Sequence, residues 1–108
     1  MSKPIKIFIS HSMSGLSEEY VLKIRQEAIV KVKSILGDNV EIIENYYHEN
    51  VPDDAGSIWH LGTSIREMEK ADYIYFHGNW KFSKGCLVEK TICDLYKLNV
   101  LNDKLEDK

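Results

Sequence analysis

Hydrophobic positions along the chain alternate between short apolar runs and stretches with helical spacing. The run IKIFIS at residues 5–10 is rich in β-branched residues and predicts a buried strand. Runs at 40–47 and 72–77 predict a second and a third strand, and LNVLN at 98–102 predicts a short last one. The chain therefore has the sequence signature of a sheet whose strands are separated by longer connections.

The connections carry apolar residues at the spacing of amphipathic helices. Ser17 is a suitable N-cap for the first helix, and Gly37 is placed to end it in a left-handed cap. The second helix is predicted over 57–70 and the third over 86–97. The apolar faces of the first two consist of Val21, Ile24, Ala28, Val32 and Ile35, and of Ile58, Leu61, Ile65 and Met68.

Strands that alternate with helices predict a parallel sheet with helices on both faces. We therefore expect residues 1–108 to form a single α/β domain, a flavodoxin-like or Rossmann-like three-layer sandwich with strand order 2-1-3-4. In that order the chain reverses direction between the first and third strands, where open α/β sheets bind their ligands. The loops at 10–16 and 77–85 leave those strand ends, so they are predicted to face one crevice.

Composition narrows the class of ligand. The 108 residues are 44% hydrophobic and 29% charged, with a formal net charge of -3. No Lys/Arg cluster is dense enough to follow a nucleic-acid backbone, and no apolar run reaches membrane-spanning length. Cys86 and Cys93 lie seven apart on one predicted helix, about 10 Å and too far to bridge, which fits a reducing cytoplasm. The histidines show no metal-ligand spacing, so no metal site is expected.

Small polar residues dominate the two loops, and each loop leads into a predicted helix. Helix N-termini favour anions, so the loops are candidates to hold a phosphate or sugar hydroxyls. Neither GxxxxGK[ST] nor GxGxxG occurs, and ordinary helix capping explains the same residues equally well. Trp80 is suited to stacking on a base or to covering a loop. The candidate substrate-binding residues are Ser10, His11, Ser12, Ser14, Gly15, Trp80, Ser83 and Gly85.

Glu89 is the candidate catalytic residue. At 100° per residue it falls inside the apolar sector of the third helix, with Cys86, Cys93, Ile92 and Tyr96 near it. A buried carboxylate persists if it neutralises, finds donors or opens into a cleft. A carboxylate flanked by hydroxyl and phosphate sites suits attack at the anomeric carbon of a sugar. The alternative is a partly exposed glutamate near the helix dipole.

Three segments, IFISHSMSG, MEKAD and WKFSKGCLVE, resemble the nucleoside 2-deoxyribosyltransferase-like superfamily, which includes deoxynucleoside 5'-monophosphate N-glycosidases. The resemblance implies that Glu89 is a nucleophile on a nucleoside or its 5'-monophosphate. It implies that Ser83 and Gly85, with the small residues of the first loop, hold the sugar or phosphate. No cofactor is implied, and family members often form homodimers or larger homo-oligomers. Tyr46, Tyr47 and Trp59 suit such an interface or the core.

Several positions depart from the family pattern. Ser64 stands where family enzymes carry an aspartate, Phe8 where a tyrosine is common, and Lys90 and Thr91 where a hydrophobic residue and glycine often follow the nucleophile. These departures favour a second hypothesis, a catalytically weak nucleotide-binding module for sensing or sequestration. A third hypothesis comes from IFISHS, which resembles the start of TIR domains, some of which cleave the nicotinamide glycosidic bond with a helix glutamate.

Overall fold

The computed structural model describes residues 3–11, 16–43 and 53–101. Strands and helices alternate along this part of the chain, with one short 3-10 helix before the last α-helix. The elements are β1 (Ile5–Ser10), α1 (Glu18–Leu36), β2 (Val40–Ile42), α2 (Ser57–Met68), β3 (Tyr73–Phe76), η1 (Trp80–Phe82) and α3 (Lys84–Tyr96). The alternation predicted from hydrophobic spacing is confirmed to this extent.

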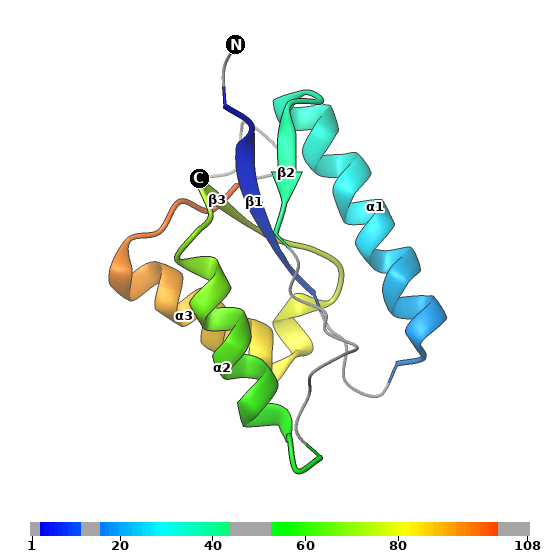
Figure 1. The fold of residues 1–108 in the computed structure, drawn as a ribbon, viewed down its shortest axis with the longest axis vertical. Coiled ribbons are helices and arrows are strands. Elements are labelled where there is room, and N and C mark those ends of the chain that lie inside the picture. Colours follow the sequence, from blue (N-terminus) through cyan, green and yellow to red (C-terminus); the bar gives the residue numbers. More distant parts are fainter. Residues whose placement is uncertain (1–2, 12–15, 44–52, 102–108) are drawn as a thin grey trace.

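The strands form a parallel sheet of order β2-β1-β3 (Figure 1). Ile5 pairs with Val40, and Ser10 pairs with Phe76 at the carboxyl end of the sheet. The prediction of a fourth strand at 98–102 was wrong for the described residues, where only a parallel bridge joins Val100 to Ile74. The layout is consistent with a flavodoxin-like arrangement. After β2 is added on one side of β1, β3 is added on the other side, so the strand order reverses at β1 as predicted.

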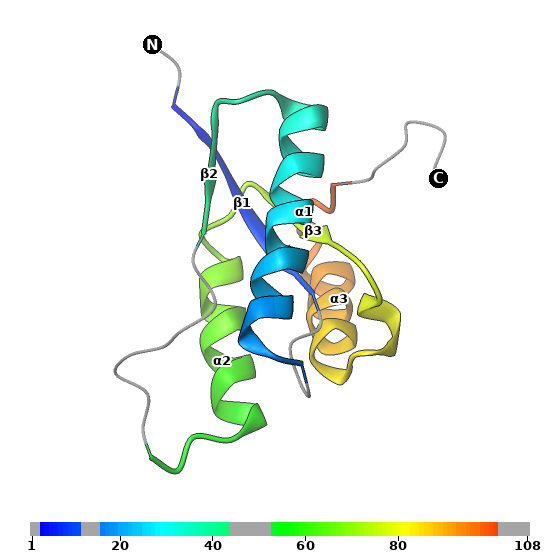
Figure 2. The ribbon, with the colours of Figure 1, turned by 90° about the vertical axis from the view of Figure 1, so that its right-hand side faces the viewer.

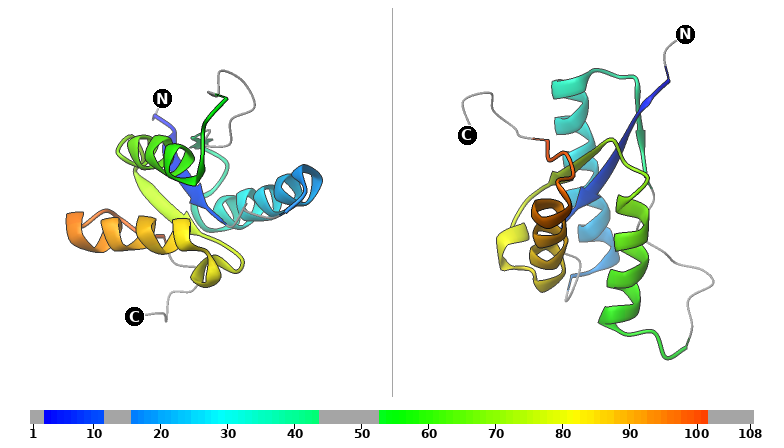
Figure 3. Two further views of the ribbon diagram at one scale, coloured as in Figure 1. Left: turned by 90° about the horizontal axis from the view of Figure 1, so that it is seen from below. Right: turned by 90° about the vertical axis from the view of Figure 1, so that its left-hand side faces the viewer.

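Helices cover both faces of the sheet, as Figures 2 and 3 show. On one face, α1 packs through Ala28 and Val32 against Ile7 and Ile9 of β1 and Tyr75 of β3. On the other face, α2 and α3 pack through Met68, Cys86 and Cys93 against Phe8, Ile74 and Phe76. Side chains alternate along β1, so Ser10 follows Phe8 onto the face that carries α2 and α3.

The ends of α1 differ in how well they were predicted. Ser17 is the N-cap, and its hydroxyl accepts a hydrogen bond from the backbone N–H of Tyr20 at 3.2 Å, as predicted. Gly37 ends the helix with a positive φ of 91°, but its ψ of -177° lies outside the left-handed helical region that was predicted. Glycine still suits this position because a positive φ strains other residues.

Two apolar residues that were predicted to face the core are exposed. Ile58 opens α2 with 79% of its surface exposed, and Tyr96 ends α3 at 74%. Both lie at helix termini, beyond the reach of the sheet that buries the middle of each helix. The second predicted strand also shortens to Val40–Ile42, and Tyr46 and Tyr47 lie outside the described residues.

Candidate active site

The carboxyl end of β1 and the first half of α3 meet at a buried hydrogen bond. Ser10 Oγ donates to Glu89 Oε1 at 2.5 Å, and the two residues are only 1% and 6% exposed. Next to this bond, the His77 N–H donates to the Ser10 carbonyl at 3.0 Å, which ties the end of β3 to the end of β1. The carboxyl ends of β1 and β3, on either side of which the strand order changes direction, therefore place a hydroxyl and a carboxylate together.

Local sequence explains this meeting. Ser83 is the N-cap of α3, so the helix begins at Lys84 and Glu89 is its sixth residue. Cys86 and Cys93 lie three residues before and four after Glu89, and both are buried against the sheet. Residues at these spacings share a helix face, so Glu89 is carried onto the sheet with its apolar neighbours. Its predicted position inside the apolar sector is confirmed.

Burial has a large effect on the Glu89 carboxyl. Desolvation raises its pKa from 4.5 to about 7, and the hydrogen bond from Ser10 opposes part of that rise. Among the described residues, no charged group contributes to this shift. A carboxyl group with a pKa near neutrality can accept or donate a proton at physiological pH, which is the property that acid–base catalysis requires.

Cys86 is a member of this site that the sequence pattern did not single out. It is 3% exposed and belongs to the core cluster that includes Phe8 and Phe76. Burial is the largest cause that raises the pKa of the thiol, and the Glu89 carboxylate adds to the rise. The thiol therefore keeps its proton at neutral pH. A buried cysteine on an apolar helix face is read as packing, so only its spacing from Glu89 could have drawn attention to it.

The first turn of α3 has donors that remain available. The Ser83 hydroxyl accepts from the Cys86 N–H at 3.4 Å, which confirms the capping role. Among the described residues, no acceptor is found for the N–H groups of Lys84 and Gly85. The space beside Gly85 is open: a Cβ atom added to this residue would have one neighbour within 4 Å among the described residues, the Leu61 side chain of α2 at 3.9 Å. The helix start thus offers two N–H groups to an anion.

Other predicted site residues have different surroundings. His11, directly after β1, is buried at 4% exposure. The ring of Trp80 lies 4.9 Å from that of Phe76 and packs against the core, which is the covering role. Half-buried Trp59 has an edge contact with the neighbouring His60 ring at 5.0 Å. Ser12, Ser14 and Gly15 lie outside the described residues.

No protein-family model, curated protein or solved structure matches this chain. Its functional assignment therefore depends on the chemistry of the site itself. In the part of the chain that the structure describes, no helix is long and apolar enough to cross a membrane. Nor does any group of three or more His, Cys, Asp or Glu side chains within that part lie in a position to hold a metal ion.

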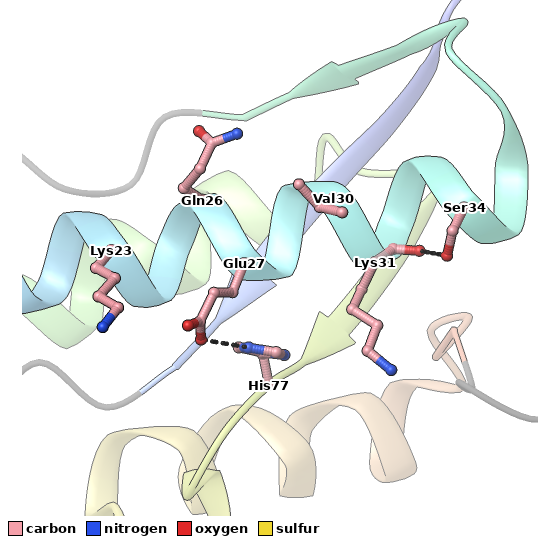
Figure 4. Close-up of a pocket in the computed structure, with 7 residues that line it drawn as sticks. All are labelled: Lys23, Gln26, Glu27, Val30, Lys31, Ser34 and His77. Atoms are coloured by element: carbon pink, nitrogen blue, oxygen red, sulfur yellow. Dashed lines mark hydrogen bonds and ion pairs between the residues drawn. The ribbon is translucent and has the colours of Figure 1, made fainter.

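An open groove of about 650 Å³ lies away from Glu89, along α1 (Figure 4). It is lined by Lys23, Gln26, Glu27, Val30, Lys31, Ser34 and His77. His77 Nε2 approaches Glu27 Oε1 at 3.8 Å, which links the residue after β3 to α1. Because α1 and α3 cover opposite faces of the sheet, this groove is separate from the Ser10–Glu89 site.

Proposed function

We propose that this protein cleaves or transfers the N-glycosidic bond of a nucleoside, a deoxynucleoside or its 5'-monophosphate, with Glu89 as the catalytic carboxylate. The observation that carries the proposal is the buried Ser10–Glu89 pair at the carboxyl end of β1, the point where the order of strands along the chain reverses. Open α/β sheets bind small ligands at this point, and a carboxylate there is placed to react with one.

The proposed reaction uses Glu89 in its ionised form. One carboxylate oxygen attacks the anomeric carbon of the sugar as the bond to the base nitrogen breaks, and the base leaves with the bonding electron pair and takes a proton from water. Water or a second base then releases the sugar from the ester and restores the carboxylate. The hydroxyl of Ser10 fixes the orientation of the carboxyl group by holding Oε1, which leaves Oε2 for attack.

A 5'-phosphate suits the start of α3. The N–H groups of Lys84 and Gly85 are available there, and the helix dipole favours an anion. Charge-assisted hydrogen bonds contribute roughly 1.5–3 kcal/mol each, so a single one corresponds to about a tenfold gain in affinity. We therefore propose that a nucleoside 5'-monophosphate binds more tightly than its nucleoside.

One observation favours a second function, a nucleotide-binding module without turnover. The resemblance to deoxyribosyltransferase-like enzymes places an acid at position 64, and this chain has Ser64, buried in α2 at 5% exposure. Described residues also supply no charged partner that would position or ionise Glu89. Such a site binds the ligand and leaves the glycosidic bond intact.

A substrate panel separates the two functions. The protein is incubated with deoxynucleosides, their 5'-monophosphates and NAD, and released base is measured by chromatography. Base release from a nucleoside or monophosphate is the expected result. Calorimetric binding of a monophosphate without base release would support the binding module, and neither binding nor release from any member would overturn both functions. Release from NAD alone would instead favour the TIR-like alternative.

A further inference from the structure

Charged side chains surround the groove along α1, on the face of the sheet opposite α3 (Figure 4). The side chains of Lys23, Glu27 and Lys31 extend from the helix on the side where His77 lies. The two lysines are eight residues apart, about 12 Å along the helix axis, and Glu27 is midway between them. The groove thus has one ammonium group on each side of a single carboxylate.

The groove has the opposite charge from the chain as a whole. Its lining includes two lysines and one glutamate, a formal charge of +1, whereas the chain has a formal net charge of -3. Its volume of about 650 Å³ is in the range of small-molecule sites. Val30, which is 59% exposed, adds an apolar surface between the two lysines. These features suit a small acidic molecule.

His77 forms a fixed wall of this groove. Its backbone N–H donates to the Ser10 carbonyl at 3.0 Å, and its ring lies 5.7 Å from the ring of buried Tyr75. Its Nε2 approaches Glu27 Oε1 at 3.8 Å, so the Glu27 carboxylate is kept near the middle of the groove. An acidic group of a ligand is therefore repelled from the middle and attracted to the lysines on either side.

We propose that this groove is a second ligand site, which binds a small molecule that has an acidic group at each end, either two carboxylates or two phosphates. One acidic group binds Lys23, the other binds Lys31, and the uncharged middle of the molecule lies along Val30. The inference goes beyond the proposed function and does not depend on it, because neither Ser10 nor Glu89 lines the groove.

Two-dimensional proton–nitrogen NMR of the full chain tests this site, because it reports both the affinity and the location of binding. The probes are adipate and fructose 1,6-bisphosphate, each compared with a relative that has one acidic group, hexanoate and fructose 6-phosphate. Exposed ion pairs are weak, so we expect at least one diacid to bind about threefold more tightly than its relative. The pair of probes that shows the gain identifies the acidic group as carboxylate or phosphate.

Variants of the lining separate this site from general attraction of anions. Lys23→Gln and Lys31→Gln should each remove most of the gain, and Glu27→Gln should raise the affinity because it removes the repelling charge. Lys33→Gln is the matched control, since Lys33 is an exposed lysine of the same helix that does not line the groove. It should leave the affinity unchanged, as should Glu89→Gln, so the result does not depend on base release.

Equal affinities for both diacids and their single-acid relatives would overturn the proposal. An equal loss of affinity in Lys23→Gln and Lys33→Gln would also overturn it, because the diacid would then be attracted by the general charge of α1. The largest NMR shifts should occur in α1 and at His77, and largest shifts at Ser83 and Gly85 instead would place the ligand at the other site and contradict the inference.

Discussion

At the scale of single residues, the raised pKa of Glu89 makes folding stability depend on pH. The folded protein holds this proton up to a pH of about 7, whereas the unfolded chain releases it near 4.5. Between these values the folded state binds more protons, so the free energy of unfolding falls as pH rises. The loss approaches about 3 kcal/mol above pH 7, since each unit corresponds to about 1.4 kcal/mol.

Glu89→Gln removes this dependence because an amide does not ionise. We expect the variant to gain stability relative to the parent protein as pH rises from 4 to 8, by up to about 3 kcal/mol. Urea unfolding at several pH values measures the difference. Glu69→Gln, at an exposed position, serves as control, and its difference from the parent should stay constant. A constant difference for Glu89→Gln would show that the carboxyl is not desolvated.

Ser64 tests the role of the missing acid. It is buried on α2, one turn after Leu61, whose side chain approaches Gly85 of α3. If a carboxyl at this position assists the reaction, Ser64→Asp should raise the rate of base release and change ligand affinity little. Ser64→Asn, with the same shape and no charge, is the matched control. Equal rates in both variants and the parent would show that position 64 has no such role.

At the scale of elements, two helices begin with the same cap and differ in what surrounds it. Ser17 caps α1, which packs on the opposite face of the sheet from Glu89, and Ser83 caps α3 and accepts from the Cys86 N–H. Replacing either serine by alanine should lower stability by about 1 kcal/mol. Only Ser83→Ala should also weaken monophosphate binding, because it disturbs the start of α3. Thermal unfolding with calorimetric titration compares the two, and equal ligand affinities would argue against a ligand at that helix start.

Element boundaries show what hydrophobic spacing can and cannot predict. The N-cap of α1 and the burial of Glu89 were predictable because capping chemistry and helical period act locally. The last strand was not, because the short LNVLN run contains two asparagines, which are depleted in strands, and its described part has only the Val100 bridge. The third helix starts two residues earlier than predicted because Ser83 provides its cap.

At the scale of the whole molecule, topology brings the site together. Parallel pairing of β1 with β3 places Ser10 beside the residues that lead into α3, although Ser10 and Glu89 are 79 positions apart in sequence. Connection rules predicted this meeting of strand ends. They could not predict the pKa of Glu89, which depends on the balance between desolvation and one hydrogen bond.

The proposed function assigns to Glu89 the reaction at a glycosidic bond. The most direct measurement is base release by the parent protein and by Glu89→Gln and Glu69→Gln, with the best substrate of the panel and with ligand binding measured in parallel. We expect release by the parent and by Glu69→Gln. We expect none by Glu89→Gln, whose affinity should stay within roughly an order of magnitude because the side-chain shape is kept. Undiminished release by Glu89→Gln would contradict a catalytic role for this carboxylate.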